Sequence, residues 1–274
     1  RPGFAGALAC LSIVPLMFWK SRPLKSLPKQ LSEGLSEGVE RIVTVGVACA
    51  VAGLVIGTLS MTDLTGKISS VMFTLASGSY FLTVITAVLV IVILGMGMPV
   101  PAVYALSAVL AAPALLALGA DLLAAHLFIV YFAAMSAITP PVAVAAFAAA
   151  SISGSNPMTI ALLACRIGMV AFIIPLLFLQ TPALLLNDSY IEIAITILIT
   201  GIACYALAGV NEGYMNGALS RSKLILLAIG IVLSLAGSGW IVLTGCVLLV
   251  AVIIQQKMSN PIQTSLNQLS NKGT

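Results

Sequence analysis

Residues 122–153 read LLAAHLFIVYFAAMSAITPPVAVAAFAAASIS, an apolar run that is broken once, at Thr139-Pro140-Pro141. The stretch before the break is marginal in length for one membrane crossing. The stretch after it, residues 142–152, has only 11 residues, and a helix of that length covers roughly half of a ~30 Å hydrocarbon core. We therefore expect a re-entrant helical hairpin over residues 122–153 that turns near mid-depth. A simple turn between two spans is the alternative.

The rest of the chain is equally apolar. Of its 274 residues, 61% are hydrophobic and 7% are charged, and the mean hydropathy is +1.17. Such a composition cannot cover a water-soluble core, so lipid must be the solvent. Lipid offers the backbone no hydrogen-bond partners, and runs such as residues 191–210 lack the alternation of barrel strands. The expected fold class is an all-α polytopic membrane protein.

The few charges indicate orientation in the membrane rather than catalysis or nucleic-acid binding. The net charge is only +4, and Lys20, Arg22, Lys25 and Lys29 follow an apolar run, as the positive-inside rule predicts for a cytoplasmic segment. Residues 20–41 are expected to form an amphipathic surface helix, or alternatively an ordinary solvated loop. The five cysteines are scattered singly and are interpreted as packing residues. The sequence has no catalytic set, metal-binding spacing or phosphate loop, so we do not expect an enzyme.

Hydropathy also predicts the organisation of the chain. Residues 1–19 are interpreted as the end of a truncated transmembrane helix, because residue 1 is Arg and an apolar run begins at once. The expected helices are residues 42–59, 71–94, 102–118, 157–179 and 191–210. Residues 224–254 are interrupted at Gly237-Ser238-Gly239 and form either two short arms or one kinked helix. Residues 257–274 are expected to be a disordered polar tail.

Two breaks at membrane depth mark the candidate site, because backbone without helical partners is tolerated there only inside protein or beside a cavity. At residues 139–141, prolines remove N–H donors, so nearby carbonyls and the Thr139 hydroxyl could bind Na⁺. The helix that follows Pro141 would direct its positive N-terminus at an anionic substrate. Residues 95–101, GMGMPVP, offer the opposing wall, with a tight interfacial turn as the alternative reading.

Isolated polar side chains carry less information. His126, near Asp121, is interpreted as an interfacial structural residue more than a proton relay. Arg166 either snorkels to the interface or pairs with hairpin carbonyls. The acidic residues of the C-terminal part are expected at loops or interfaces; they are Asp188, Glu192 and Glu212.

Several motifs in this order resemble one known family. They are GMGMP at 95–99, PAVYAL at 101–106, AHLF at 125–128, SAITPPVA at 136–143 and NPM at 156–158. Together they are similar to the large membrane subunit of TRAP transporters, most of all to permeases in which the small and large subunits are fused. The resemblance is specific over residues 95–185 and weaker over residues 46–94 and the C-terminal helices.

The resemblance implies one repeat of an inverted-repeat elevator transporter in the inner membrane, with residues 42–186 as the transport repeat and 187–256 as C-terminal helices. It implies Na⁺ coupling, an organic-acid substrate and a periplasmic substrate-binding protein. A first repeat has no counterpart here, so that repeat and a small membrane subunit are expected partners, and this chain alone should not transport. Residues 139–141 match a hairpin tip, and residues 95–99 match the unwound helix segment opposite it.

On this basis we assign candidate site residues. The expected ion-binding residues are Gly95, Met96, Gly97, Thr139 and Pro140. The expected substrate-binding residues are Pro99, Ser136, Thr139 and Pro141. A non-transporting scaffold that docks a partner is the alternative function, and a channel is disfavoured because the long helices lack a continuous polar stripe. Substrate identity and the choice between Na⁺ and H⁺ stay open.

Overall fold

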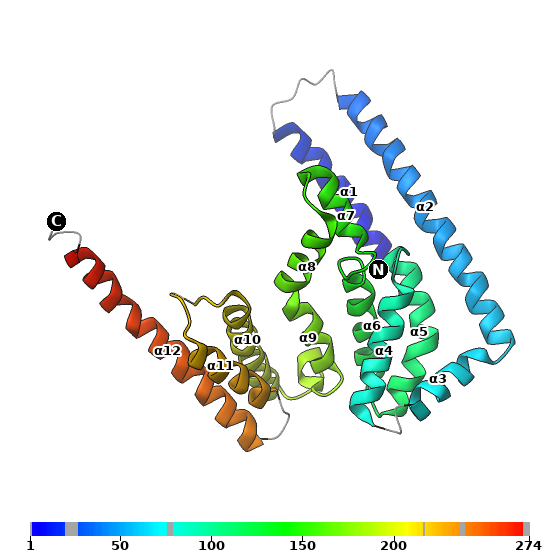
Figure 1. Ribbon diagram of the computed structural model, residues 1–274. Coiled ribbons are helices and arrows are strands. Elements are labelled where there is room, and N and C mark those ends of the chain that lie inside the picture. Colours follow the sequence, from blue (N-terminus) through cyan, green and yellow to red (C-terminus); the bar gives the residue numbers. More distant parts are fainter. Residues whose placement is uncertain (1, 20–26, 76–78, 216, 236–238, 271–274) are drawn as a thin grey trace. The chain divides into compact units, whose positions relative to one another are not determined.

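The computed structural model describes residues 2–19, 27–75, 79–215, 217–235 and 239–270. These residues are almost entirely helical (Figure 1). The helices are α1 (Pro2–Trp19), α2 (Leu27–Met61), α3 (Leu64–Leu75), α4 (Tyr80–Leu94), α5 (Val100–Ala117), α6 (Leu122–Met135), α7 (Val144–Ser153), α8 (Pro157–Ile167), α9 (Met169–Phe178), the 3₁₀ helix η2 (Pro182–Leu185), α10 (Tyr190–Glu212), α11 (Arg221–Ser234) and α12 (Gly239–Ser270). The all-helical prediction is confirmed for this part of the chain.

The chain divides into two units, Arg1–Ala50 and Val51–Thr274. The first unit holds α1 and the first part of α2. We predicted a surface helix over residues 20–41 and a separate span over residues 42–59. Residues 27–41 are helical, but α2 continues from them through the predicted span without a break. No proline lies between the two segments to stop a helix once it has begun. Lys20, Arg22 and Lys25 lie outside the described residues.

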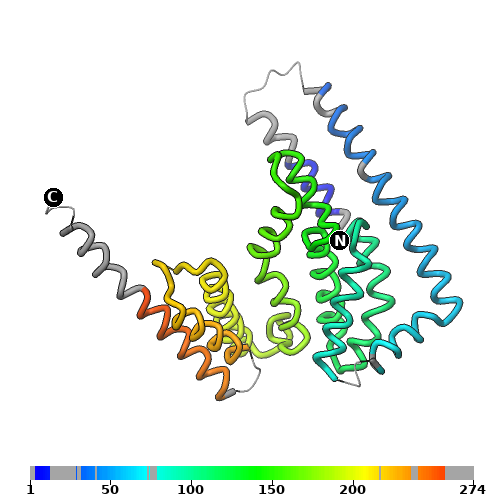
Figure 2. The backbone as a smooth tube through the Cα atoms, in the orientation of Figure 1, coloured from blue at the N-terminus to red at the C-terminus, as the bar shows by residue number. Residues whose placement is uncertain are grey.

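In the second unit, α4, α5, α6 and α9 form one bundle, with α3 packed on α5 (Figure 2). Its core contains the fully buried Ile91, Leu115 and Phe128. The Ser69 hydroxyl donates to the carbonyl of Leu110 at 2.9 Å and ties α3 to α5. This bundle carries both breaks that the sequence singled out.

A second core lies between α10, α11 and α12, around Leu227 and Leu249. Helices α11 and α12 pack along one another, so the interruption at residues 237–239 separates two arms and does not kink one helix; Gly237 and Ser238 themselves are outside the described residues. A Cβ atom on Gly245 would overlap the backbone of α11 at Leu233 and Ser234. The two backbones therefore approach as closely as glycine allows.

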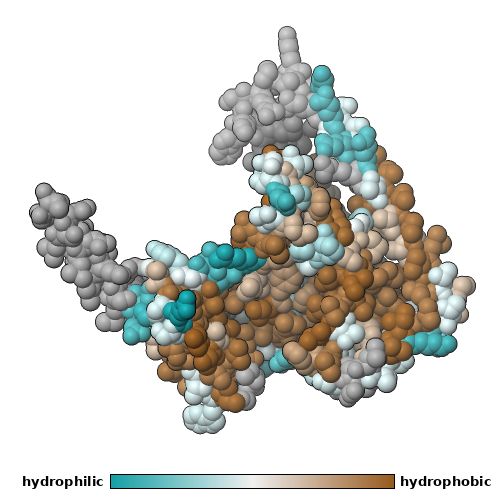
Figure 3. All heavy atoms as spheres, in the orientation of Figure 1, coloured by the Kyte–Doolittle hydropathy of each residue, from teal (hydrophilic) through white to brown (hydrophobic). Residues whose placement is uncertain are grey.

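Apolar side chains cover much of the second unit's outer surface (Figure 3). Phe81, Leu162 and Leu198 are each at least 60% exposed, as is typical of helices that face lipid. Among the described residues, Ser32–Met61, Val100–Ala117 and Tyr190–Glu212 are long and apolar enough to cross a membrane, and the bent pair α7 and α8 would make a fourth span.

Two helix predictions and one prediction of disorder need correction. Residues 71–94 are not one helix, because α3 ends at Leu75 and α4 begins after Ser79, which has extended backbone angles. The helix expected over residues 157–179 divides at Gly168 into α8 and α9. The tail expected to be disordered is helical as far as Ser270, as part of α12, because a helix that is already nucleated extends at little cost through polar residues.

Candidate functional site at two helix breaks

The first break, Gly95–Pro99, reverses the chain. Helix α4 ends at Leu94, Gly97 has a φ of +88°, and α5 starts after the extended Pro99. A φ in that range is accessible to glycine and strained for other residues. Since α4 and α5 then pack side by side (Figure 1), this break is the turn of a helical hairpin. The family resemblance led us to expect an unwound helix segment at residues 95–99, and that prediction is wrong.

The second break, Ser136–Ala143, lies between α6 and α7 and holds the cis peptide Pro140–Pro141. Within residues 122–153, all of which are described, α6 and α7 do not pack along one another. Helix α7 packs instead on α8, and these two helices bend by 118° across residues 154–156. The predicted re-entrant hairpin with its tip at Thr139 is therefore wrong, because its two arms do not pack on one another and α7 is paired with α8 instead.

After α7 the chain turns back toward α6 through two helices: α8 packs on α7, and α9 packs on α6. Gly154, with a φ of +70°, ends α7, and the Asn156 side chain accepts from Met158 N at 2.8 Å to start α8. Pro157 occupies the first helical turn, as the sequence predicted. The short second arm that suggested a hairpin with α6 is thus one arm of the bent pair α7 and α8.

The two breaks meet at Ser136 and Gly95. The Ser136 side chain is 3% exposed, and its Oγ lies 2.7 Å from the carbonyl oxygen of Ala133 and 3.3 Å from that of Gly95. Its single proton goes to the nearer acceptor, Ala133. A Cβ atom on Gly95 would overlap Ser136 Oγ and Cβ. Gly95 is therefore required for the contact between the breaks.

The side chain of Thr139 is oriented by its own helix. Its hydroxyl donates to the carbonyl of Met135 at 2.8 Å, so its lone pairs are left for another partner. The carbonyls of residues 136–139 are less free than the sequence suggested, because Thr139, Ala145 and Ala143 donate to the carbonyls of Ser136, Ala137 and Thr139. No described residue donates to the carbonyls of residues 96–98 or 140–142.

Helix α8 braces the second break. The Cys165 thiol lies 3.4 Å from the carbonyl oxygen of Ile138, and a Cβ on Gly168 would lie 3.4 Å from Ile138 Cδ1. Arg166 does not pair with carbonyls of the predicted hairpin. It pairs with the end of α10, through the carbonyl of Asn211 and the carboxylate of Glu212.

His126 is partly buried, and its Nδ1 lies 3.0 Å from the hydroxyl oxygen of Tyr104 on α5. This contact joins α5 to α6 and fits the structural interpretation of His126. Asp121 caps α6, since its carboxylate accepts from the amides of Leu123 and Ala124.

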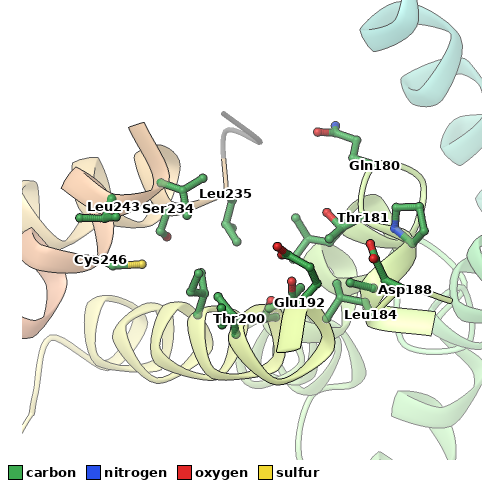
Figure 4. Close-up of a pocket in the computed structure, with 17 residues that line it drawn as sticks. Gln180, Thr181, Leu184, Asp188, Glu192, Thr200, Ser234, Leu235, Leu243 and Cys246 are labelled. Carbon is green, nitrogen blue, oxygen red and sulfur yellow. The ribbon is translucent and has the colours of Figure 1, made fainter. Parts of the chain in front are cut away.

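A separate cavity of about 610 Å³ lies between η2, α10 and the facing ends of α11 and α12 (Figure 4). It includes none of the predicted site residues. Its carboxylates, Asp188 and Glu192, flank the start of α10, where Asp188 accepts from Ser189 N and Ser189 Oγ caps Glu192 N. Acidic side chains are favoured at a helix N-terminus for electrostatic reasons, so the charges here have a structural explanation.

The comparison with family models is decisive for the class of protein. Residues 2–193, well over half of the chain, match the DctM component of the tripartite ATP-independent periplasmic transporters. The chain belongs to the DctM family. It is therefore a multi-pass membrane component of a TRAP transporter and not an enzyme, and such a component works with a periplasmic binding protein and other subunits. Searches of curated proteins and of solved structures returned no match.

The structure thus brings two groups of predicted site residues together through Ser136 and Gly95, and groups Thr139, Pro140 and Pro141 in the second break. Their roles as ligands stay predictions. Sequence reasoning missed the contributions of Cys165 and Gly168. The Gly at position 168, inside an expected helix, was the available signal.

Proposed function

We propose that this DctM component couples uptake of an organic acid, delivered by the periplasmic binding protein, to the inward movement of Na⁺, and that ion and substrate bind where the two helix breaks meet. The observation that carries the proposal is the contact between Ser136 and Gly95, at which two non-helical segments meet within an apolar helical bundle. Non-helical backbone in such a setting is typical of ion and substrate sites in secondary transporters.

The oxygen geometry supports a cation at this point. Ser136 Oγ makes its shorter hydrogen bond with the carbonyl of Ala133 and only a long contact of 3.3 Å with the carbonyl of Gly95, so lone pairs on both Ser136 Oγ and the Gly95 oxygen are available to a cation. Na⁺ is close in size to Ca²⁺, whose oxygen ligands lie at about 2.4 Å, so neighbouring ligands at right angles are about 3.4 Å apart. The unpaired carbonyls of residues 96–98 and 140–142 and the Thr139 hydroxyl could complete the shell.

The start of α7 supports an anionic substrate. Ala143 has left-handed backbone angles, with φ 38° and ψ 56°, and no described residue accepts from the amides of Val142 and Val144. Free amides at the positive end of a helix favour a carboxylate. The α7 N-terminus and the carbonyls of the same break would place the anion beside Na⁺, so each ligand would strengthen binding of the other.

The test is uptake into proteoliposomes by the complete transporter that contains this chain, with its binding protein and an inward Na⁺ gradient. Thr139→Val is expected to raise the Na⁺ concentration for half-maximal uptake by about tenfold, the equivalent of one lost ligand or charge-assisted contact. Thr86→Val is the matched control, because Thr86 makes the same bond to its own helix, to the Leu82 carbonyl at 2.7 Å, away from both breaks.

Uptake in the wild type that does not respond to the Na⁺ gradient would overturn the coupling. An equal shift in the Thr139→Val and Thr86→Val variants would show that the effect is structural and would remove Thr139 from the ion site.

A further inference from the structure

The C-terminal ends of α8 and α10 are joined by reciprocal hydrogen bonds. Arg166 Nη2 and Nε donate to the carbonyl of Asn211 at 2.6 and 3.2 Å. In return, Asn211 Nδ2 donates to the carbonyl of Arg166 at 2.6 Å. The Glu212 carboxylate lies 3.6 Å from Arg166 Nη2. We call these contacts, made by Arg166, Asn211 and Glu212, the α8–α10 clamp.

The clamp satisfies a specific need at each helix end. The last carbonyls of a helix have no intrahelical donor, and Arg166 and Asn211 each lie one residue before the end of their helix. Each side chain therefore supplies a donor to the orphan carbonyl of the other helix. The guanidinium charge also lies at the negative ends of two helix dipoles.

The clamp adjoins the residues that hold the second break. On α8, Cys165 contacts the carbonyl of Ile138 at 3.4 Å, and the chain at Gly168 passes close to the Ile138 and Met135 side chains. Ile138 directly precedes Thr139. The position of α8 along its axis thus determines the position of the carbonyl that adjoins the proposed ion ligands.

We propose that Arg166 is a positioning residue: through the α8–α10 clamp it uses α10, most of which lies beyond the family match, to fix α8 and so the Ile138–Thr139 segment of the break. This role deepens the proposed function and rests on it. Arg166 touches neither ion nor substrate.

The hydrogen-bond geometry of Arg166 should matter more to the clamp than its charge. Arg166 and Glu212 side chains are 49% and 57% exposed, and ion pairs at that exposure contribute little. The forked contact with a carbonyl depends instead on the planar guanidinium, which lysine cannot reproduce. Arg166→Lys should therefore behave as a loss of the clamp, although it keeps the charge, whereas Glu212→Gln should resemble the wild type.

The first experiment tests the clamp without measuring transport. The complete transporter is reconstituted in nanodiscs, and alkylation of Cys165 by N-ethylmaleimide is followed by peptide mass spectrometry. Arg166→Gln and Arg166→Lys should each raise the Cys165 alkylation rate by about tenfold, because the thiol is released from the Ile138 carbonyl. Asn211→Ala, which keeps its backbone carbonyl, should give a smaller rise, and Glu212→Gln none.

The second experiment measures Na⁺-driven uptake with the same variants. Arg166→Lys should raise the Na⁺ concentration for half-maximal uptake several-fold while the maximal rate at saturating Na⁺ changes less than twofold, a split that misfolding alone would not produce. Asn211→Ala tests the same point if Arg166 variants fold poorly.

An unchanged Cys165 alkylation rate in Arg166→Lys and Asn211→Ala would overturn the inference, as would full rescue of Na⁺ affinity by lysine. These outcomes differ from failure of the proposed function, in which the wild type shows no Na⁺-driven uptake whatever the state of Cys165.

Discussion

The two breaks of the α4–α9 bundle send the chain in different directions. At Gly95–Pro99 the chain reverses, and α4 and α5 pack side by side; at Ser136–Ala143 it continues, and α7 leaves α6 to pack on α8. The first break depends on a glycine with positive φ, and the second contains two consecutive prolines. A break in an apolar run therefore fixes where a helix stops but not where the chain goes next.

Among variants that test how the two breaks are held, Gly95→Ala should lower stability most, because it places a methyl group where the two breaks touch. Its Cβ would overlap Ser136, and overpacking of a buried contact should lower the free energy of unfolding by about 3 kcal/mol. The thermal unfolding midpoint in detergent measures it. Gly57→Ala is the control, since a Cβ at Gly57 in α2 meets nothing within 4 Å.

Removal of the opposing side chain should reverse that loss. In the double variant Gly95→Ala with Ser136→Gly, most of the decrease in the thermal unfolding midpoint should be reversed, because the overlapping atoms are gone. If the double variant is no more stable than Gly95→Ala alone, the two breaks do not touch as described.

A smaller effect is expected from Gly97→Ala, which tests the turn of the first break by itself. Space around Gly97 is open, so only its φ of +88° opposes a side chain. The strain should cost about 1 to 2 kcal/mol. The same unfolding assay applies, and a neutral result would show that the first break does not need the left-handed conformation that reverses the chain.

Ser136→Ala should cost about 1 kcal/mol in unfolding free energy, the value of one ordinary hydrogen bond. Uptake assays should in addition show a higher Na⁺ requirement if Ser136 Oγ is an ion ligand. A loss of stability with unchanged Na⁺ dependence would restrict Ser136 to a structural role.

The smallest effect is expected at Ala143, in the second break. Ala143 has a φ of 38° and is 1% exposed, so Ala143→Gly relieves backbone strain but removes a buried methyl group. These opposing terms should leave a net change below about 1 kcal/mol. A large destabilisation would mean that packing of Ala143 against α8, not backbone geometry, holds the second break.

The sequence predicted the positions of both breaks because proline and glycine act on the local backbone, within a few residues. It could not assign hairpin and broken helix correctly, since an 11-residue arm fits either half of a re-entrant hairpin or half of a broken span. The deciding signal was Gly154 and Asn156, which end α7 and start α8 at a sharp bend. The predicted hairpin over residues 122–153 stops just before that turn, so the sharp bend between α7 and α8 was missed.

Contacts between segments distant in sequence were the least predictable. Arg166 and Asn211 are 45 residues apart, and their pairing depends on where two helices end in space, which hydropathy does not specify. The interpretation of Arg166 as a partner of carbonyls was close in chemistry but wrong in location. Gly95 and Ser136, 41 residues apart, were placed on opposing walls only because both lay at breaks.

At Gly245, the backbones of α11 and α12 approach so closely that van der Waals contact, not exclusion of water, holds the pair together. Helices that separate within a bilayer expose their contact surfaces to lipid, so no apolar surface becomes hydrated. The heat capacity of unfolding arises from such hydration, and this separation step should have almost none. The free energy that joins α11 to α12 will then vary nearly linearly with temperature, and cooling will tighten the pair.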